Sequence, residues 1–155
     1  MKHSTIAKTL AIATAAALAL GMASTAKAAN KGCTNASLNG TFAYTSTGTI
    51  TAPPALAGPL AEVGTQTFDG YGNTTAAAMI SQNGNITPLT ITGTYTVNPD
   101  CTGTMTLQVS PFGISVPVYF VLDSTLSEFQ AIELSPGVVI TRIARWQFPV
   151  NSWNH

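Results

Sequence analysis

Residues 92–104 read TGTYTVNPDCTGT, a nearly symmetrical stretch with Gly-Thr on both sides of an Asn-Pro-Asp-Cys centre. Proline presets φ to about −65° at the second position of a turn, and Asn98 and Asp100 are favoured turn formers. The Thr, Tyr and Val residues on either side favour extended strands. The stretch therefore predicts a β-hairpin, with strands over 86–98 and 102–110 that meet at a corner containing Cys101.

The remainder of the chain repeats this alternation of short strands and turns. Runs rich in Thr, Val, Ile, Phe and Tyr are separated by Gly, Pro and Asn, and helical periodicity extends over no more than a few residues. Residues 69–73, 82–85 and 135–137 contain the residue types that tight turns require. Three prolines exclude residues 51–59 from a central strand and predict a long loop. The other strands are expected at 38–50, 60–69, 74–82, 114–123, 127–134 and 138–147.

Eight strands with near-neighbour connections fit either of two all-β folds, a small closed antiparallel barrel or a β-sandwich. Closure removes exposed sheet edges, which suits a small domain. An eight-stranded barrel is also just wide enough to be filled by side chains or to hold one small ligand. We expect the barrel, with the sandwich as the alternative.

The N-terminal segment has the features of a bacterial secretory signal peptide. Lys2 and Lys8 precede an apolar run over 10–22, and Ala26-Lys27-Ala28 supplies a small-x-small cleavage site. The apolar run is too short for a membrane-spanning helix, which needs about 20 residues. We predict a signal peptide over 1–28, a single domain over 29–147 and a tail over 148–155, in a secreted or periplasmic protein that inserts into no membrane after cleavage.

Cys33 and Cys101 are the two cysteines of the chain, and both follow the predicted signal peptide. In an oxidising compartment a disulfide between them is the default expectation. Its loop of nearly seventy residues would contribute about 4 kcal/mol in the chain-entropy model. Catalytic or metal-binding thiols are the alternative.

The charge balance excludes two classes of partner. Beyond residue 28 the chain keeps three basic residues, Lys31, Arg142 and Arg145, and all six acidic ones, for a net charge of about −3. Such a chain lacks the basic surface that binds nucleic acid or anionic lipid. We expect neither partner and no cofactor.

The usual catalytic and metal-binding arrangements are missing from the sequence. His155 is the one histidine after residue 28, and a residue on a tail is poorly oriented to act as a base. Ser-His-Asp and Cys-His arrangements and His- or Cys-based metal sites therefore fail. Residues 69–73 (DGYGN) place oxygen ligands at alternate positions but lack the further acids of a calcium loop, so a hairpin turn is favoured. We expect no metal site.

The last two strands can be paired from their turn. Placing residues 136–137 at the tip pairs Ala131 with Arg142 and Glu128 with Arg145. Opposite charges directly across an antiparallel pair attract, so we expect Glu128 and Arg145 to form an ion pair on one face of the hairpin.

The opposite face of this hairpin carries Arg142 and Trp146. If that face is the barrel interior, Arg142 is an interior charge, with Glu133 as its natural partner. Two interpretations stay open: a buried pair that fixes the register or reaches solvent at the barrel mouth, and a ligand-facing guanidinium suited to a carboxylate. The candidate lumen or ligand-facing residues are Tyr44, Tyr95, Phe120, Glu133, Arg142 and Trp146.

Residues 114–123 are apolar on both faces, since Val116, Val118 and Phe120 alternate with Pro117 and Tyr119. A contiguous apolar patch is unusual on a monomer. We expect the outer face to be covered by the Pro-rich loop, by the tail or by another subunit, in a monomer or a small homo-oligomer.

Several motifs together carry a family resemblance. They are the runs 33–44 (CTNASLNGTFAY), 58–64 (GPLAEVG), 67–73 (TFDGYGN), 81–84 (SQNG), 92–104, 120–122 and 137–145. Over nearly all of the chain after the signal peptide, this set resembles small secreted bacterial proteins, mostly uncharacterised, of the allene oxide cyclase barrel-like group. The resemblance implies an exported antiparallel barrel of calycin-like shape. No catalytic position of that group matches a residue here.

Three functional hypotheses follow. The first is a secreted, non-enzymatic barrel that binds a small apolar ligand. The second is a barrel cyclase or isomerase that acts on a hydrophobic substrate. The third is a structural or adhesive surface module. A hollow barrel interior would favour the first two, and a solidly packed one would count against both.

Overall fold

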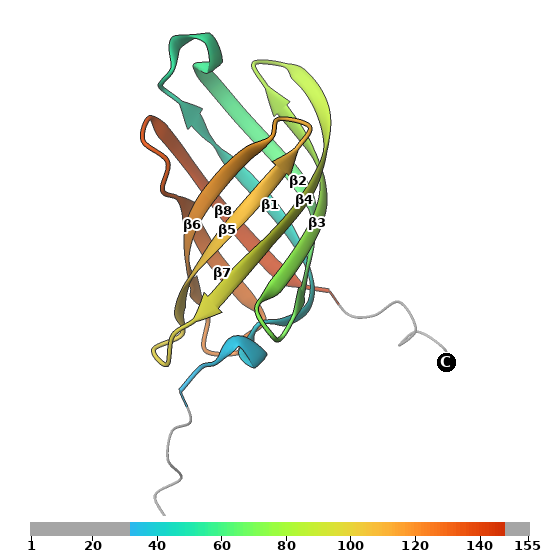
Figure 1. Cartoon of the computed structure of the whole chain (residues 1–155), viewed down its shortest axis with the longest axis vertical. Helices are drawn as coiled ribbons and strands as arrows, with labels where there is room; N and C mark the ends of the chain where they lie inside the picture. The colour runs from blue at the N-terminus through green and yellow to red at the C-terminus, as the bar shows by residue number, and fades with distance from the viewer. Residues whose placement is uncertain (1–31, 148–155) are drawn as a thin grey trace, which may run out of the picture.

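The computed structural model describes residues 32–147, which form a closed antiparallel β-barrel (Figure 1). Each strand pairs with the next along the chain, and β8 pairs with β1 to close the sheet, so the predicted barrel is confirmed over the β-sandwich. The predicted signal peptide (1–28) and tail (148–155) lie outside the described residues. The strands are β1 Asn39–Ile50, β2 Gly58–Asp69, β3 Asn73–Gln82, β4 Asn85–Val97, β5 Thr102–Ser110, β6 Ile114–Leu122, β7 Glu128–Glu133 and β8 Val138–Trp146.

The predicted strand bounds agree closely with the observed ones, and the largest difference is at the start of β2. This strand begins at Gly58, and Pro59 lies within it opposite Thr49. Proline is tolerated near the end of a strand, where its missing N–H removes little of the ladder. The Pro-rich loop is therefore confined to residues 51–57 and contains one 3-10 turn, η2 (Pro54–Leu56).

The connections gather at the two ends of the barrel (Figure 1). The upper end in that view carries the 51–57 loop and the turns after β3, β5 and β7. The lower end carries the turns after β2, β4 and β6, together with the 3-10 turn η1 (Asn35–Ser37). We call these the open end and the closed end.

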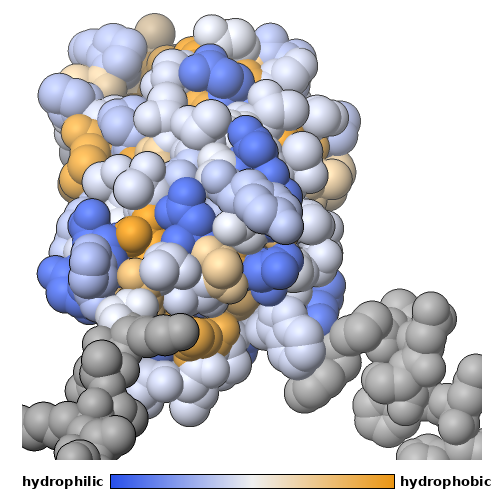
Figure 2. Space-filling model, turned by 60° about the horizontal axis from the view of Figure 1, so that its bottom comes forward, coloured by the Kyte–Doolittle hydropathy of each residue, from blue (hydrophilic) through white to orange (hydrophobic). Residues whose placement is uncertain are grey.

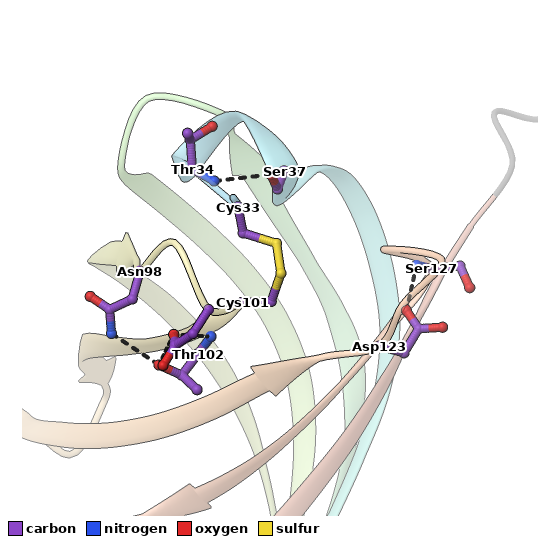
Figure 3. The surroundings of a disulfide bond; sticks show 9 residues. Cys33, Thr34, Ser37, Asn98, Cys101, Thr102, Asp123 and Ser127 are labelled. Carbon is purple, nitrogen blue, oxygen red and sulfur yellow. Dashed lines mark hydrogen bonds between the residues drawn. A yellow bond between two sulfur atoms is a disulfide. The ribbon is translucent and has the colours of Figure 1, made fainter. Parts of the chain in front are cut away.

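The corner between β4 and β5 has the predicted turn. The Cys101 N–H donates to the Asn98 carbonyl (3.0 Å), and the Asn98 N–H donates to the Thr102 carbonyl (2.8 Å). Cys101 adopts a φ of 66°, and a left-handed residue at this place completes a three-residue hairpin loop. Figure 3 shows the Asn98 side-chain amide bonded to the Thr102 hydroxyl across the corner (3.0 Å).

The predicted disulfide between Cys33 and Cys101 is present (Figure 3). Hydrogen bonds fix the same segment across the closed end. Among them, the Cys33 N–H donates to the Pro99 carbonyl (3.1 Å), and the Tyr95 hydroxyl donates to the Leu38 carbonyl (2.8 Å). Leu38 is completely buried. The segment that leads into β1 therefore plugs this end of the barrel.

Aromatic side chains fill the closed half of the barrel. We call Phe42, Phe68, Tyr95, Phe120 and Phe129 the aromatic cluster; each is at most 4% exposed, and neighbouring ring centroids lie 5.1–5.9 Å apart. The rings meet edge to face or tilted, as aromatic pairs prefer.

The outer face of β6 is not covered by the other described residues. Tyr119 is 37% and Val121 is 44% exposed. The Pro-rich loop does not cover them, because its Pro53 and Leu56 instead line a cavity at the open end. Hydrophobic residues form separate patches among hydrophilic ones on the face shown in Figure 2. No helix within residues 32–147 is long and apolar enough to span a membrane.

Removal of the disulfide tests the construction of the closed end. We expect the Cys33→Ser/Cys101→Ser double variant to lose about 4 kcal/mol of unfolding free energy, because the unfolded chain regains the entropy of the open loop. Urea denaturation of both proteins under non-reducing conditions measures the difference. An unchanged midpoint would contradict a stabilising tether.

Candidate functional site

The open half of the barrel contains a cavity of about 570 Å³. Pro53, Leu56 and Phe112 lie at its mouth, on the loops of the open end. Small-molecule sites commonly measure about 300–1,000 Å³ and are mainly apolar. The cavity fits that description, because its walls are aliphatic side chains: Leu60, Ile80, Leu89, Ile91, Leu107, Val109, Val116, Val118 and Ile140.

A change of side-chain type along single strands explains why only one half is hollow. The inward residues of β6 pass from Phe120 in the aromatic cluster to Val118 and Val116 in the cavity wall. An eight-stranded barrel is just wide enough for large side chains to fill it. Where the inward residues are Val, Ile and Leu, the space along the axis stays open.

Polar side chains separate the cavity from the aromatic cluster. We call Tyr44, Ser46, Glu62, Gln66 and Arg142 the polar layer. Arg142 Nε donates to Ser46 Oγ (3.0 Å), and Nη1 donates to Gln66 Oε1 (3.0 Å). Nη2 lies 3.5 Å from Glu62 Oε2. The guanidinium carbon lies 3.9 Å from the centre of the Tyr44 ring, and the Tyr44 hydroxyl donates to Glu62 Oε1.

The polar layer also forms hydrogen bonds with residues on the side of the filled half. The Gln66 side-chain amide donates to Thr74 Oγ1 (3.0 Å), which in turn donates to the Thr67 carbonyl (2.9 Å). Among the described residues, every buried side-chain nitrogen and oxygen has a hydrogen-bond partner. A buried polar network stabilises a fold only when its members are satisfied in this way.

Strand register produces the polar layer. Ser46 on β1 pairs with Arg142 on β8 and with Glu62 on β2, so the three residues form one row across three adjacent strands. Their side chains point to the same face, because residues directly opposite one another in a sheet do so. The β8–β1 pairing that closes the barrel therefore also assembles the ion pair.

The observed partner of Arg142 differs from the predicted one. The pairing of Ala131 with Arg142 is confirmed, as is the outer ion pair between Arg145 Nε and Glu128 Oε2 (2.8 Å). Inside the barrel, however, Glu62 rather than Glu133 forms the salt bridge with Arg142. Glu133 lies diagonally on the neighbouring strand, whereas Glu62 shares the row of Arg142.

Glu133 is nevertheless part of the cavity lining. Burial raises the pKa of its carboxyl above the usual value, and a hydrogen bond with Ser135 and the charge of Arg142 oppose that rise. Burial also raises the pKa of Tyr44 well above its ordinary range, so its hydroxyl stays protonated and donates to Glu62. The lining of the cavity thus contains one guanidinium and two carboxyl groups.

The structure distributes the six candidate lumen residues over both halves of the barrel. Glu133 and Arg142 line the cavity, and Tyr44 lies beneath the guanidinium. Tyr95 and Phe120 belong to the aromatic cluster and do not line the cavity. Trp146, at the end of β8, is 38% exposed and lies beside Gly40 near the closed end, so it also does not line the cavity.

Sequence reasoning did not identify Ser46, Glu62 and Gln66 as interior residues. The alternation along β2 carries a signal for two of them, because Glu62 and Gln66 share the parity of Leu60 and Phe68. The carboxylate and the amide interrupt that apolar face. Polar residues at intended core positions mark either a network or a functional site.

The loop 69–73 uses its carboxylate to form a turn. Asp69 Oδ1 accepts hydrogen bonds from the N–H groups of Tyr71, Gly72 and Asn73 (2.7–2.9 Å). The hydrogen bond from the Asn73 side chain, followed by these backbone bonds, lowers the pKa of Asp69 to about 2. The expected hairpin turn is therefore confirmed. Within residues 32–147, no cluster of His, Cys, Asp and Glu could hold a metal ion.

Comparison with known proteins places the fold among β-barrels. No protein-family model matches the chain, and no curated protein does. The chain is similar to a redesigned beta barrel, b11L5F_LGL (20% identity, TM-score 0.53, covering 74% of this chain and 95% of that one). It is also similar to a redesigned beta barrel, mFAP1, bound to DFHBI (21% identity, TM-score 0.52, covering 72% of this chain and 96% of that one). A third similar structure is EF1p2_mFAP2b bound to DFHBI (16% identity, TM-score 0.53, covering 72% of this chain and 94% of that one).

A double-mutant cycle tests whether the polar layer acts as one unit. Arg142→Met leaves Glu62 buried without its counter-ion, and we expect a loss of about 3–5 kcal/mol of unfolding free energy. Adding Glu62→Gln removes the unpaired charge, so the double variant should be more stable than the sum of the single changes predicts. Urea denaturation gives the four free energies.

The matched control uses the same two substitutions at the ion pair on the outside of the barrel, between Arg145 on β8 and Glu128 on β7. Arg145 is 75% exposed, so the cycle Arg145→Met/Glu128→Gln should show a coupling of less than about 1 kcal/mol. If the coupling energy of the inner pair is no larger than that of the outer pair, the polar layer does not act as one unit.

Proposed function

We propose that this protein is a secreted, non-enzymatic β-barrel that binds a small, largely apolar molecule in the cavity between Arg142 and the open end. The observation that carries the proposal is the cavity itself: about 570 Å³ in a barrel whose other half is filled. A protein under no demand for binding gains stability by filling such a space, since each cavity costs packing energy. The aliphatic walls and the few polar groups at one end are the usual composition of a ligand site.

The structural relatives support this proposal only at the level of shape. Two designed barrels with this fold hold DFHBI, so a barrel of this architecture has room for a small molecule. At 16–21% identity the likeness concerns the fold alone, and it does not indicate which ligand this chain takes.

The proposed secreted or periplasmic location rests on the cysteines and on the predicted signal peptide. A disulfide that closes a 68-residue separation is typical of proteins that fold in an oxidising compartment. Mass spectrometry of the protein exported by a bacterial host would show whether the chain begins after Ala28.

A second candidate function is isomerisation or cyclisation of a hydrophobic substrate. The observation that favours it is Glu133, a carboxyl group that lines the cavity and whose pKa is raised by burial, as is usual for a general acid or base. In that case a bound molecule would be recovered chemically changed, and Glu133→Gln would abolish the change while the molecule still binds.

Blocking the cavity tests the binding proposal. N-phenyl-1-naphthylamine is an uncharged dye whose fluorescence rises in apolar sites, and we expect it to titrate the wild-type protein to saturation at one dye per chain. Val116 lines the cavity, so Val116→Trp should weaken this binding at least about tenfold by occupying the space.

The control is the same substitution on the outside of the barrel. Val63 is 58% exposed on β2, and Val63→Trp should leave dye binding unchanged. If the wild type takes up no dye, or if both variants bind like the wild type, the cavity is not a binding site, and the structural or adhesive role becomes the better explanation.

A further inference from the structure

The charge at the inner end of the cavity is already balanced by the protein. Each of the three nitrogens of Arg142 has a partner in the polar layer, and Glu62 supplies the counter-charge at 3.5 Å. Glu62 is 8% exposed and Arg142 is 12% exposed, so bulk water screens this pair little. The guanidinium therefore does not need a negative charge from a ligand.

The second carboxyl group makes an anionic ligand less favourable still. Within residues 32–147, the charged side chains that line the cavity are Glu62, Glu133 and Arg142. A carboxylate that entered the cavity would lose its water, and the lining offers it two carboxyl groups for one guanidinium. Burial in this cavity raises the pKa of Glu133 even though Ser135 and Arg142 oppose the rise, so desolvation disfavours a carboxylate here.

A neutral oxygen meets no such penalty. A guanidinium has five N–H donors. Two of those of Arg142 are hydrogen-bonded, to Ser46 and Gln66, and Glu62 lies at ion-pair distance. Donors are left for a hydroxyl, carbonyl or ester oxygen at the inner end of the cavity, while the aliphatic walls bury the rest of the molecule.

We propose that the cavity selects an apolar molecule that ends in a neutral hydrogen-bonding group, such as an alcohol, ketone or ester, and discriminates against the corresponding carboxylate. This inference rests on the proposed binding function and narrows its ligand class. It replaces the interpretation of Arg142 as a carboxylate receptor, because that role is taken by Glu62.

Displacement of N-phenyl-1-naphthylamine by two molecules of equal chain length provides the test. At pH 7.5, where decanoate is ionised, we expect decan-1-ol to displace the dye with a Kd at least about tenfold lower than that of decanoate. Glu133→Gln removes one carboxyl group from the cavity and should narrow this ratio several-fold. Glu128→Gln, on the outer face of the same strand, is the matched control and should leave the ratio unchanged.

The outcomes separate the inference from the function on which it rests. Decanoate binding as tight as or tighter than decan-1-ol would overturn the selection of a neutral end group and leave the binding function standing. Binding of neither molecule, with no uptake of the dye, would overturn the binding function as well. The ratio of the Kd values of decanoate and decan-1-ol, measured on the wild-type protein, tests the selection of a neutral end group without any variant. A Glu133→Gln protein that failed to fold would therefore not obscure the result.

Discussion

The salt bridge between Arg142 and Glu62 is the constraint around which the interior of this barrel is arranged. It joins β8 to β2 across β1, and it therefore exists only when the barrel is closed in one register. A slip of one residue between these strands would turn one of the two charges to the outside and leave the other buried alone. Removing a single partner from such a buried pair costs more than the pair contributes, so the arrangement favours one closure over its alternatives.

The polar layer also lies at the boundary between a densely packed half of the barrel and a hollow half. On the closed side, five aromatic rings, the disulfide and the buried Leu38 supply dense packing at the end where the chain enters the first strand. On the open side, the inward positions carry aliphatic side chains and a space of about 570 Å³ remains. The filled half supplies buried contacts that do not depend on the volume left open on the other side of the polar layer.

Most of the fold could be predicted from the sequence, because it is encoded locally. Alternating β-formers, turn residues such as those at 98–101, and the last hairpin with Glu128 opposite Arg145 each depend on a few neighbouring residues. The site could be predicted only in part. The last hairpin predicts that Arg142 lies on the face opposite Glu128 and Arg145. Its pairing with Glu62 depends on strands far apart in the chain, and the cavity depends on the combined volume of inward side chains from every strand.

A crystal structure under xenon pressure tests most directly whether the polar layer divides a filled half from a hollow one. Xenon binds in apolar cavities, so its anomalous signal reports empty space without reference to any particular ligand. We predict xenon between Arg142 and the open end, against Leu89, Ile91 and Leu107, and none among Phe42, Phe68 and Phe129. A barrel without xenon on the open side of Arg142, or with xenon among the aromatic rings, would contradict this division.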